Sequence, residues 1–285
     1  MHISMPHSSR ALRVLVVHYG DPPTTQSALA ALQASTRQPE SVLVVDHAAE
    51  PFPEQDGVEL IRPKGNAGYG AGINIGLGAL LGHGVSENDI VVAMNNDAIV
   101  SPHALADLME WWEAHPQPAL AGPVGGAVNL LTGRSHIARQ SDRAGNGPLR
   151  ATLHTVPYLH GSFLAAPYAV WSKLKGFPEQ PFLYWEDVLL AARAEACRVP
   201  LHVLSQVAVE HPRDALAQPS DDQLYYLVRN GARFLERATP LPWRPWWWVM
   251  NRLRYQYHAH QPRHRTVAAA LRDTLANKVG RRHAR

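Results

Sequence analysis

The sequence contains almost no cysteine: Cys197 is the only one among 285 residues. A single thiol excludes an intramolecular disulfide framework and any zinc or iron–sulfur site that needs several cysteines, and it is typical of a reducing, cytosolic compartment. The sequence also lacks an apolar run of the roughly 18–20 residues that a membrane span requires, and residues 1–13 have no apolar signal-peptide core. We therefore expect a cytoplasmic location.

Acidic residues are nearly missing from the C-terminal part of the chain. From Pro240 onward, ten lysines and arginines accompany one acid, Asp273, whereas residues 1–239 contain more acids than bases. The small net charge of +3 thus averages a body with a charge of −6 and a tail with a charge of +9. This asymmetry predicts that the two parts meet different partners.

Apolar residues are plentiful, at 46% of the chain, which excludes wholesale disorder. Continuous apolar runs predict buried strands at residues 12–19, 41–46, 58–61 and 90–94. Helical spacing of apolar residues predicts helices at 25–35, at 71–81 and from Ser101, where Ser101 is expected to cap the helix and Pro102 to occupy its first turn. Strands that alternate with helices predict an α/β fold with a mostly parallel central sheet flanked by helices.

The second half of the sequence is less regular. Residues 122–157 are rich in glycine, arginine and small polar residues, and we interpret them as loops and short strands that cover a site. Further along, the pattern predicts ordered structure at 158–166, a strand at 206–210, and helices at 185–196, 221–237 and 266–279.

Polar side chains follow several of the predicted strands. Tyr19, Asp46 and the run Asn95, Asn96 and Asp97 each stand where a buried strand ends. In an open α/β sheet, ligands bind beyond the carboxyl ends of the strands, so Asp46 is well placed to bind a nucleobase or a ribose. The alternative for each of these residues is a turn or a helix cap.

A glycine-rich stretch at residues 65–76 suggests nucleotide binding. It fits neither the dinucleotide fingerprint nor a P-loop, because the glycine spacing is wrong and no Gly-Lys-Ser/Thr occurs in the chain. A bound diphosphate would therefore need another counter-charge. Asp97, flanked by amides at the end of a buried strand, is a hard-oxygen ligand suited to Mg²⁺ or Mn²⁺.

Glu186 and Asp187 form a second acidic feature, beside Tyr184 and Trp185 at the start of a predicted helix. One of these carboxylates, partly removed from water, could act as a general base. The alternative is that both are ordinary acidic residues at a helix N-terminus, where the helix dipole favours them. His211, at the end of a short strand, is a candidate ligand, although a lone histidine is usually structural.

The order of these features resembles glycosyltransferase family 2, and most closely its bacterial rhamnosyltransferase-like subgroup. Residues 66–76 are similar to the family's Asn-x-Gly-x-(x)-x-Gly-x-Asn-x-Gly, and further segments stand at familiar spacings: 161–164, 176–177, 182–187, Arg193, and 225–230 with its Tyr-Tyr-(x)₂-Arg-Asn. The resemblance implies a GT-A fold, a nucleotide-sugar donor and a divalent cation, Mg²⁺ or Mn²⁺.

Individual roles follow from the resemblance, residue by residue. It implies that Asp187, with Glu186 beside it, is the catalytic base, and that Asp97 and His211 hold the metal. It further implies a donor site formed by Tyr19, Asp46, Asn66, Gly70, Asn74, Asn95 and Asn96. Trp185, His160 and Arg193 are assigned to the acceptor site or to a lid, as are Arg134, Arg139, Arg143 and Arg150. Asn95 stands where the family usually has Asp, and His47 where it usually has Asn.

By the same resemblance, residues 1–239 form the catalytic domain, with a nucleotide-sugar half at about 11–120 and an acceptor half at about 121–239. Residues 240–285 form a basic, Trp-rich helical extension. The implied reaction is an inverting, metal-dependent transfer from a nucleotide sugar, with dTDP-rhamnose as the family-level donor, to a hydroxyl of a glycan or of a lipid-linked cell-envelope acceptor.

Two alternatives to this function stay open at this point. A sugar nucleotidyltransferase usually carries a Gly-rich signature with Arg or Lys near the first strand, and the turn after Tyr19 has neither base. The other alternative is a non-catalytic module that binds sugars or a membrane surface. Nucleic-acid binding is not expected, because no recognised fold for it accompanies the acidic body.

Four of the eight tryptophans gather in residues 243–248, followed by arginines and tyrosines up to residue 257. Tryptophan and tyrosine suit a membrane interface, and arginine suits anionic head groups, which predicts peripheral contact with the inner face of the plasma membrane. Packing on the catalytic domain, or contact between two copies of the chain, is the alternative.

Overall fold

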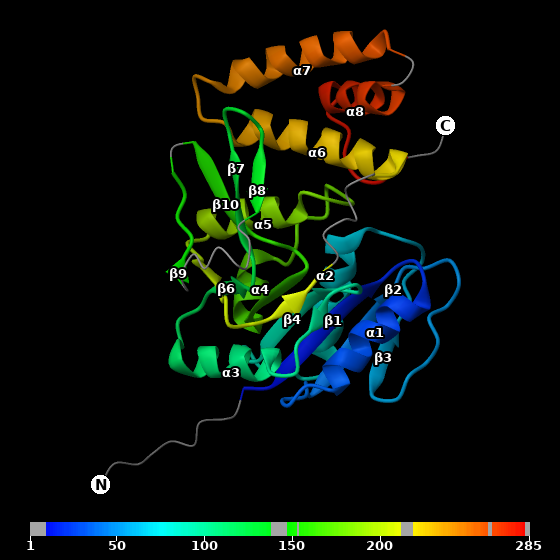
Figure 1. The fold of residues 1–285 in the computed structure, drawn as a ribbon, viewed down its shortest axis with the longest axis vertical. Coiled ribbons are helices and arrows are strands. Elements are labelled where there is room, and N and C mark those ends of the chain that lie inside the picture. Colours follow the sequence, from blue (N-terminus) through cyan, green and yellow to red (C-terminus); the bar gives the residue numbers. More distant parts are fainter. Residues whose placement is uncertain (1–9, 138–146, 153, 212–218, 262–263, 283–285) are drawn as a thin grey trace.

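The computed structural model describes residues 10–137, 147–152, 154–211, 219–261 and 264–282 (Figure 1). The strands are β1 Leu12–His18, β2 Ser41–Asp46, β3 Val58–Ile61, β4 Ile90–Asn95, β5 Ile99–Val100, β6 Leu120–Gly122, β7 Gly125–Asn129, β8 Ser135–Ile137, β9 Gly147–Pro148, β10 Thr155–Leu159, β11 Phe163–Pro167, β12 Leu201–Val203 and β13 Val209–Glu210. The helices are α1 Pro22–Gln33, α2 Tyr69–Gly82, α3 Ala104–Ala114, α4 Tyr168–Leu174, α5 Glu186–Ala196, α6 Asp221–Ala238, α7 Arg244–Ala259 and α8 Arg265–Leu275.

An eight-stranded sheet forms the centre of the molecule, in the order β3-β2-β1-β4-β11-β6-β12-β9. β1 pairs in parallel with β2 on one side and β4 on the other, so that His18 lies opposite Asp46 and Val17 opposite Asn95. β11 runs antiparallel between β4 and β6, and its amino end therefore meets the carboxyl end of β4. These pairings confirm the predicted mostly parallel sheet and bring the polar residues at the strand ends to one edge.

Both faces of the sheet are covered by helices, because alternate residues of the apolar strands point to opposite sides. In β1, Leu15 and Val17 join a core with Ile73 of α2. Val14 and Val16, on the other face, join a second core that includes Leu29 of α1 and Leu108 of α3. The continuous apolar runs in the sequence therefore correspond to strands buried on both faces.

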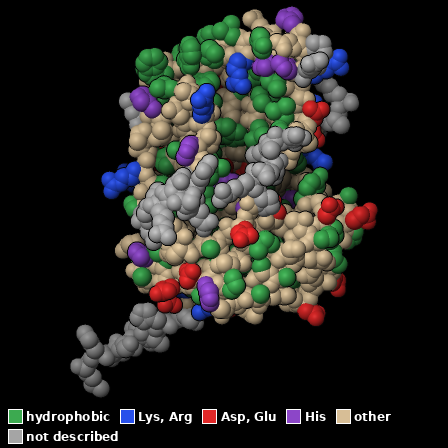
Figure 2. Space-filling view, in the orientation of Figure 1, with side chains coloured by type: hydrophobic (Ala, Val, Ile, Leu, Met, Phe, Trp, Pro, Cys, Tyr) green, Lys and Arg blue, Asp and Glu red, His purple; other side chains and the backbone are tan. Residues whose placement is uncertain are grey.

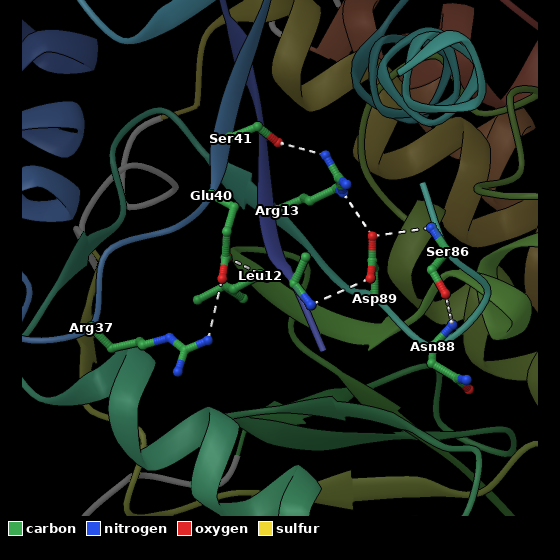
Figure 3. A network of polar contacts seen from close by, with 9 residues as sticks. Leu12, Arg13, Arg37, Glu40, Ser41, Ser86, Asn88 and Asp89 are labelled. Atoms are coloured by element: carbon green, nitrogen blue, oxygen red, sulfur yellow. Dashed lines mark hydrogen bonds and ion pairs between the residues drawn. The ribbon is translucent and has the colours of Figure 1, made fainter. Parts of the chain in front are cut away.

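Charged residues close the amino ends of the central strands, away from the polar edge (Figure 3). Arg13, at the start of β1, donates from Nε to Asp89 Oδ2 at 3.0 Å and from a terminal nitrogen to Ser41 Oγ at 3.4 Å. Asp89 also accepts from the backbone N–H of Ser86 at 3.1 Å. This network joins the starts of β1, β2 and β4.

Several predicted boundaries are corrected by the structure. α3 begins at Ala104 with His103 as its N-cap, so Ser101 does not cap the helix; its N–H instead pairs with Ala208 O at 2.9 Å. The predicted strand at 206–210 is reduced to β13, which pairs with β5. Residues 122–157 are more regular than expected, because β10, β7 and β8 form a three-stranded sheet.

The C-terminal helices pack against the body of the molecule. Figure 1 shows α6, α7 and α8 stacked together at one end, beyond α5. α6 begins with a capping box between Ser220 and Gln223. In α7, Trp247 is buried and donates from Nε1 to Leu130 O at 2.7 Å. Within the described residues, no helix is long and apolar enough to cross a membrane.

Candidate active site

A large cleft opens at the carboxyl edge of the sheet, with a volume of about 2790 Å³. Its walls come from the ends of β1, β2 and β4, the segment before β11, the start of α5, and α6 with the segment that follows α8. Figure 2 shows the surface hollowed in this region, between the sheet and the C-terminal helices. Ligand pockets of proteins usually measure about 300–1000 Å³, so the cleft has room for two substrates at once.

The ends of β1 and β4, with the loop between β3 and α2, bring four of the predicted donor-site residues to this cleft. Tyr19, Asn66, Asn95 and Asn96 all line it. Asn96 donates from Nδ2 to Tyr19 O at 3.2 Å and to Thr25 Oγ1 at 3.0 Å, which fixes the turn after β1 against the turn after β4. Asn66 Oδ1 accepts from the backbone N–H of Gly68 at 2.8 Å and orders the loop that leads into α2.

Asp97 and His211 face each other across the same cleft, and the two predicted metal ligands are thus brought together. The distance from His211 Nε2 to Asp97 Oδ1 is 3.1 Å, and Asn95 Nδ2 lies 3.2 Å from the same histidine nitrogen. Burial acts to raise the pKa of Asp97, but hydrogen bonding and positive charge from His211 outweigh it, so that the net shift of this pKa is downward. Asp97 is therefore ionised at neutral pH.

The ligand atoms that these two residues offer, a carboxylate oxygen and an imidazole nitrogen, suit a divalent cation. Asp97 Oδ1 is buried and accepts no well-aligned hydrogen bond in the described structure. The 3.1 Å between His211 Nε2 and Asp97 Oδ1 would allow the two residues to hold one cation together. Among the described residues, no group of three or more His, Cys, Asp and Glu side chains is placed to hold a metal, so water, a substrate or other oxygen groups would supply further ligands.

Glu186 and Asp187 form the first turn of α5 and line the cleft, directly after a strained loop. Phe182, Tyr184 and Trp185 all have φ between 63° and 71°, a left-handed conformation that residues with a Cβ rarely adopt. Such strain costs on the order of 1–3 kcal/mol per residue and persists only where surrounding contacts enforce it. The strained loop aims the two carboxyl groups into the cleft.

The two adjacent carboxyl groups have different environments. Asp187 accepts hydrogen bonds from the backbone N–H groups of Gly161 at 3.2 Å and Val188 at 2.8 Å, whereas Glu186 Oε2 is buried without a described partner. Burial, reinforced by the charge of Asp187, raises the pKa of Glu186 to about 8. Burial also raises the pKa of Asp187, although His160 and the backbone donors counteract part of the effect. Glu186 is therefore protonated at pH 7, whereas Asp187 accepts the two backbone hydrogen bonds, which favour the carboxylate form.

Arg229 and Asn230 of α6 hold the strained loop in place. The Asn230 amide donates to the carbonyls of Pro181, Leu183 and Tyr184 at 2.8–3.2 Å. Arg229 donates to Pro181 O at 2.9 Å. Three carbonyls of one loop are thus bound by a single buried side chain, which explains how positive φ angles are maintained there. The Tyr-Tyr-(x)₂-Arg-Asn segment noted in the sequence supports the start of α5.

His160 and Trp185, assigned to the acceptor site or to a lid, both line the cleft. The His160 ring lies 5.3 Å from that of His211, and its Nδ1 is 2.9 Å from Ser162 Oγ. Trp185 donates from Nε1 to Leu227 O at 3.1 Å and packs against Gly231, where an added Cβ would lie 2.6 Å from the indole. Trp185 therefore also anchors α5 to α6.

Three predicted donor-site residues lie away from the cleft. Asp46 is buried, and its carboxylate accepts from Ala48 N and Phe52 N, both at 2.9 Å, and from Arg62 at 2.6 Å. Gly70 and Asn74 pack against the loop at 177–179 instead: a Cβ on Gly70 would lie 3.0 Å from Phe177 Cβ, and Asn74 binds the backbone of Phe177 through both amide atoms. At these three positions, the residues of the family motifs pack against their neighbours or hold loops in place.

The described arginines among those assigned to the acceptor site or to a lid do not line the cleft. Arg193 donates to the carbonyls of Leu174 and Gly176 at 2.8 and 3.1 Å, and so caps the C-terminal end of α4. Arg134 and Arg150 are absent from the lining of the cleft. Arg139 and Arg143 lie outside the described residues.

Several residues in or beside the cleft are not predicted from the sequence. His47 is buried against α2, lines the cleft, and its Nε2 has no described partner; the departure from the family's usual Asn was the available signal. Tyr69 donates from its hydroxyl to Gly161 O at 3.0 Å and tightens the loop beside Asp187. Residues 277–282, which follow α8, reach the cleft as well, and no motif in the sequence predicts their position.

The comparisons with known proteins agree with this geometry. No family model matches the chain. A curated protein of Mycobacterium tuberculosis, N-acetylglucosaminyl-diphospho-decaprenol L-rhamnosyltransferase, is 25% identical over 232 residues, which cover 70% of this chain and 76% of the relative.

Two solved structures share the fold. The crystal structure of S. aureus TarS 1–349 matches with a TM-score of 0.52 at 15% identity, covering 94% of this chain and 92% of TarS. The mannosyltransferase PcManGT from Pyrobaculum calidifontis, in complex with GDP-Man and Mn²⁺, matches with a TM-score of 0.52 at 19% identity, covering 94% and 76%. The predicted GT-A fold and the resemblance to rhamnosyltransferase-like enzymes are therefore confirmed, and the chain is a glycosyltransferase.

Proposed function

We propose that this glycosyltransferase moves a rhamnosyl group from a nucleotide sugar such as dTDP-rhamnose to a hydroxyl of a lipid-linked sugar diphosphate, with inversion at the anomeric carbon. The observation that carries this proposal is that Asp187, held by two backbone N–H groups, lines the same cleft as Asp97 and His211. The activity of the mycobacterial relative, an L-rhamnosyltransferase named for a lipid-linked acceptor, supports the sugar and the class of acceptor.

The chemical step assigned to Asp187 is general base catalysis. Its carboxylate takes the proton of the acceptor hydroxyl while the hydroxyl oxygen bonds to the anomeric carbon of the donor sugar. The bond from that carbon to the nucleoside diphosphate breaks on the opposite face, and the nucleoside diphosphate leaves with the bonding electrons. The raised pKa of Asp187 makes it a stronger proton acceptor than an exposed aspartate.

Glu186 is assigned a different role from Asp187. Because it is protonated at neutral pH, it places no second negative charge beside the base and can donate a hydrogen bond. Environments that push the pKa values of neighbouring acids apart are a common way to divide acid and base roles in an active site.

The donor side of the cleft is assigned to the ends of β1, β2 and β4. Tyr19, Asn66 and Asn96 would contact the nucleotide sugar, and His47 offers an unpaired ring nitrogen close by. Asp97 and His211 would hold a divalent cation, Mn²⁺ or Mg²⁺. When bound, such a cation neutralises charge on the departing diphosphate. The Mn²⁺ in the PcManGT structure supports this assignment.

A peripheral membrane contact through α7 is part of the proposal. Trp243, Trp246, Leu253 and Tyr257 are each more than half exposed and lie at helical spacing on one side of α7. Arg252 stacks on Trp248 at 3.5 Å, and α7 contains no acidic residue. Figure 2 shows hydrophobic side chains gathered at the end of the molecule where α7 lies. Such a helix suits an anionic membrane surface.

The direct test is a panel of dTDP-rhamnose, UDP-GlcNAc and GDP-mannose, each incubated with the protein, Mn²⁺ and a short-chain lipid diphosphate that carries N-acetylglucosamine. We expect nucleotide release that depends on the acceptor, fastest with dTDP-rhamnose, and a product of inverted anomeric configuration by NMR. Absence of transfer from every donor, together with pyrophosphate release from a nucleoside triphosphate and a sugar phosphate, would identify a nucleotidyltransferase instead.

A further inference from the structure

The chain segment that follows α8 returns to the active-site cleft and is fixed there. The backbone N–H of Gly280 donates to Gln180 O at 2.8 Å, and Arg229 of α6 donates to Gly280 O at 2.8 Å. The N–H of Arg282 donates to the Tyr226 hydroxyl at 2.7 Å. These bonds attach residues 280–282 both to α6 and to the loop that precedes the strained residues before Asp187.

This end of the cleft is basic. Its cationic side chains are Arg229, Arg272, Lys278, Arg281 and Arg282, and its acids are Asp222 and Asp273. Asp273 lies 3.2 Å from Arg272 and 3.1 Å from Lys278, and Asp222 lies 3.3 Å from Arg282. Within the part of the chain that the structure describes, neither Arg229 nor Arg281 has a carboxylate partner. An excess of positive charge is left facing the cleft.

Solvent screens the positive charge of Arg229 poorly, because the side chain is buried. It is 1% exposed, and its guanidinium carbon lies 5.3 and 5.0 Å from the ring centres of Tyr225 and Tyr226. It donates hydrogen bonds to the neutral oxygens of Asn230, Gly280 and Pro181. A buried cation that is neutralised by no carboxylate attracts anions more strongly than an exposed one, because the surrounding dielectric is lower.

The opposite end of the cleft carries acidic side chains, among them Asp97, Asp187 and Glu210. The two ends are close along the chain: the Arg281 guanidinium lies 5.8 Å from the Phe182 ring, and the five steps from Phe182 to Asp187 span at most about 18 Å. One elongated molecule could therefore place a hydroxyl at Asp187 and an anionic group among the basic side chains.

We propose that Lys278, Arg281 and Arg282, with the buried charge of Arg229, form a subsite for the diphosphate of the acceptor. The identity of the acceptor rests on the proposed function. A diphosphate could also belong to the donor, but the residues assigned to the donor lie at the ends of β1, β2 and β4, and Figure 1 shows α5 between those strands and α6–α8. The basic tail seen in the sequence thus contributes directly to substrate binding.

The test compares the double variant Lys278→Gln/Arg281→Gln with the wild type and with Lys173→Gln, an exposed lysine on α4 outside the cleft. Binding of geranyl diphosphate, measured by calorimetry, needs no turnover. We expect its Kd to rise roughly tenfold or more in the double variant, as loss of two charge-assisted contacts implies, and to stay unchanged in Lys173→Gln. The KM for the diphosphate-linked acceptor should rise to a similar extent, with the KM for the nucleotide sugar unchanged.

An unchanged Kd for geranyl diphosphate in the double variant would overturn the subsite. A rise in the KM for the nucleotide sugar instead of the acceptor would overturn its assignment to the acceptor and place the donor diphosphate there. If no sugar is transferred by the wild type, but geranyl diphosphate binding still depends on Lys278 and Arg281, the subsite stands and only the proposed function fails.

Discussion

The backbone N–H of Gly161 donates to Asp187 Oδ2 at 3.2 Å, across 26 residues of sequence. This bond joins the segment before β11, at the centre of the sheet, to the first turn of α5. Hydrogen bonds to a carboxylate favour its charged form, so the contact both positions Asp187 and offsets part of the rise in its pKa that burial causes. Glu186 Oε2 has no partner among the described residues, and burial raises the pKa of Glu186 to about 8.

Removal of either metal ligand should weaken donor binding only when the metal is present. For Asp97→Ala and His211→Ala, we expect the Kd of dTDP-rhamnose in Mn²⁺ to rise about 10–100-fold. EDTA should bring the wild type to the same weak affinity and change the variants little. Calorimetry with Asp56→Ala as the control, an exposed acid far from the cleft, checks this. Equal wild-type affinity in Mn²⁺ and in EDTA would refute the metal site.

Glu186 should make the folded protein less stable as pH rises. Its pKa is about 8 in the fold, against 4.5 in an unfolded chain, so between these values the folded state binds a proton that the unfolded state releases. The contribution of this group to the free energy of unfolding therefore decreases from about pH 5 to pH 8. Asp187, Tyr69 and Tyr184 are the titratable groups that interact with it.

Urea unfolding of Glu186→Gln at several pH values measures this effect. The stability of the variant relative to the wild type should increase steadily between pH 5 and pH 8, because glutamine does not titrate. Glu54→Gln, which changes an exposed residue, should show no such trend. A constant difference over this range would mean that Glu186 is ionised in the fold.

Asn230 should be needed for catalysis as well as for stability. Asn230→Ala leaves carbonyls of the strained loop without a donor, which costs about 1–3 kcal/mol of the free energy of unfolding for each buried group left unsatisfied. Because the loop aims Asp187, kcat should also fall at a temperature where the variant is fully folded.

Asn251→Ala provides a matched control for Asn230→Ala. Asn251 is a buried amide of α7 that donates to Glu236 Oε1 at 2.8 Å and lies outside the cleft. It should lower the melting temperature and leave kcat unchanged. If the two variants lose activity equally once both are folded, Asn230 has no positioning role.

The exposed side of α7 should bind anionic membranes. The wild type is expected to sediment with vesicles that contain phosphatidylglycerol at low salt, and Trp246→Ala/Leu253→Ala should bind at least roughly tenfold more weakly, because each large side chain removed from water contributes about 1.5–3 kcal/mol at full burial. Leu81→Ala removes a side chain that is 65% exposed on α2 and should have no effect. If the wild type does not bind these vesicles at low salt, the membrane contact is refuted and α7 serves only to pack against the rest of the protein.

The sequence predicted the sheet well, and the reason is physical. β1, β2 and β4 are buried on both faces, so their apolar runs are uninterrupted and easy to recognise. The carboxyl edge follows from the parallel arrangement, which is why Asn95, Asp97 and their neighbours were expected together. The start of α3 was misplaced because the backbone N–H of Ser101 pairs with Ala208, a contact that depends on a strand more than 100 residues away.

Side-chain roles were less predictable, since a motif does not say which way a residue faces. Asp46 stands at the expected strand end but turns its carboxylate to Arg62 and to its own loop. Asn74 lies in a familiar motif yet binds Phe177. The return of residues 280–282 to the cleft depends on tertiary contacts with Arg229 and Tyr226, and local sequence carries no signal for it.

The central claim is that Asp187 is the base of a sugar transfer, and Asp187→Asn tests it most directly. Asparagine keeps the shape and an oxygen that can accept from Gly161, but it cannot take a proton. We predict that kcat, followed by release of the nucleoside diphosphate from dTDP-rhamnose with a lipid-linked acceptor, falls by about 10²–10⁴, while the Kd for the donor and the kcat of Asp56→Asn stay unchanged. A kcat for Asp187→Asn equal to that of the wild type would contradict the account.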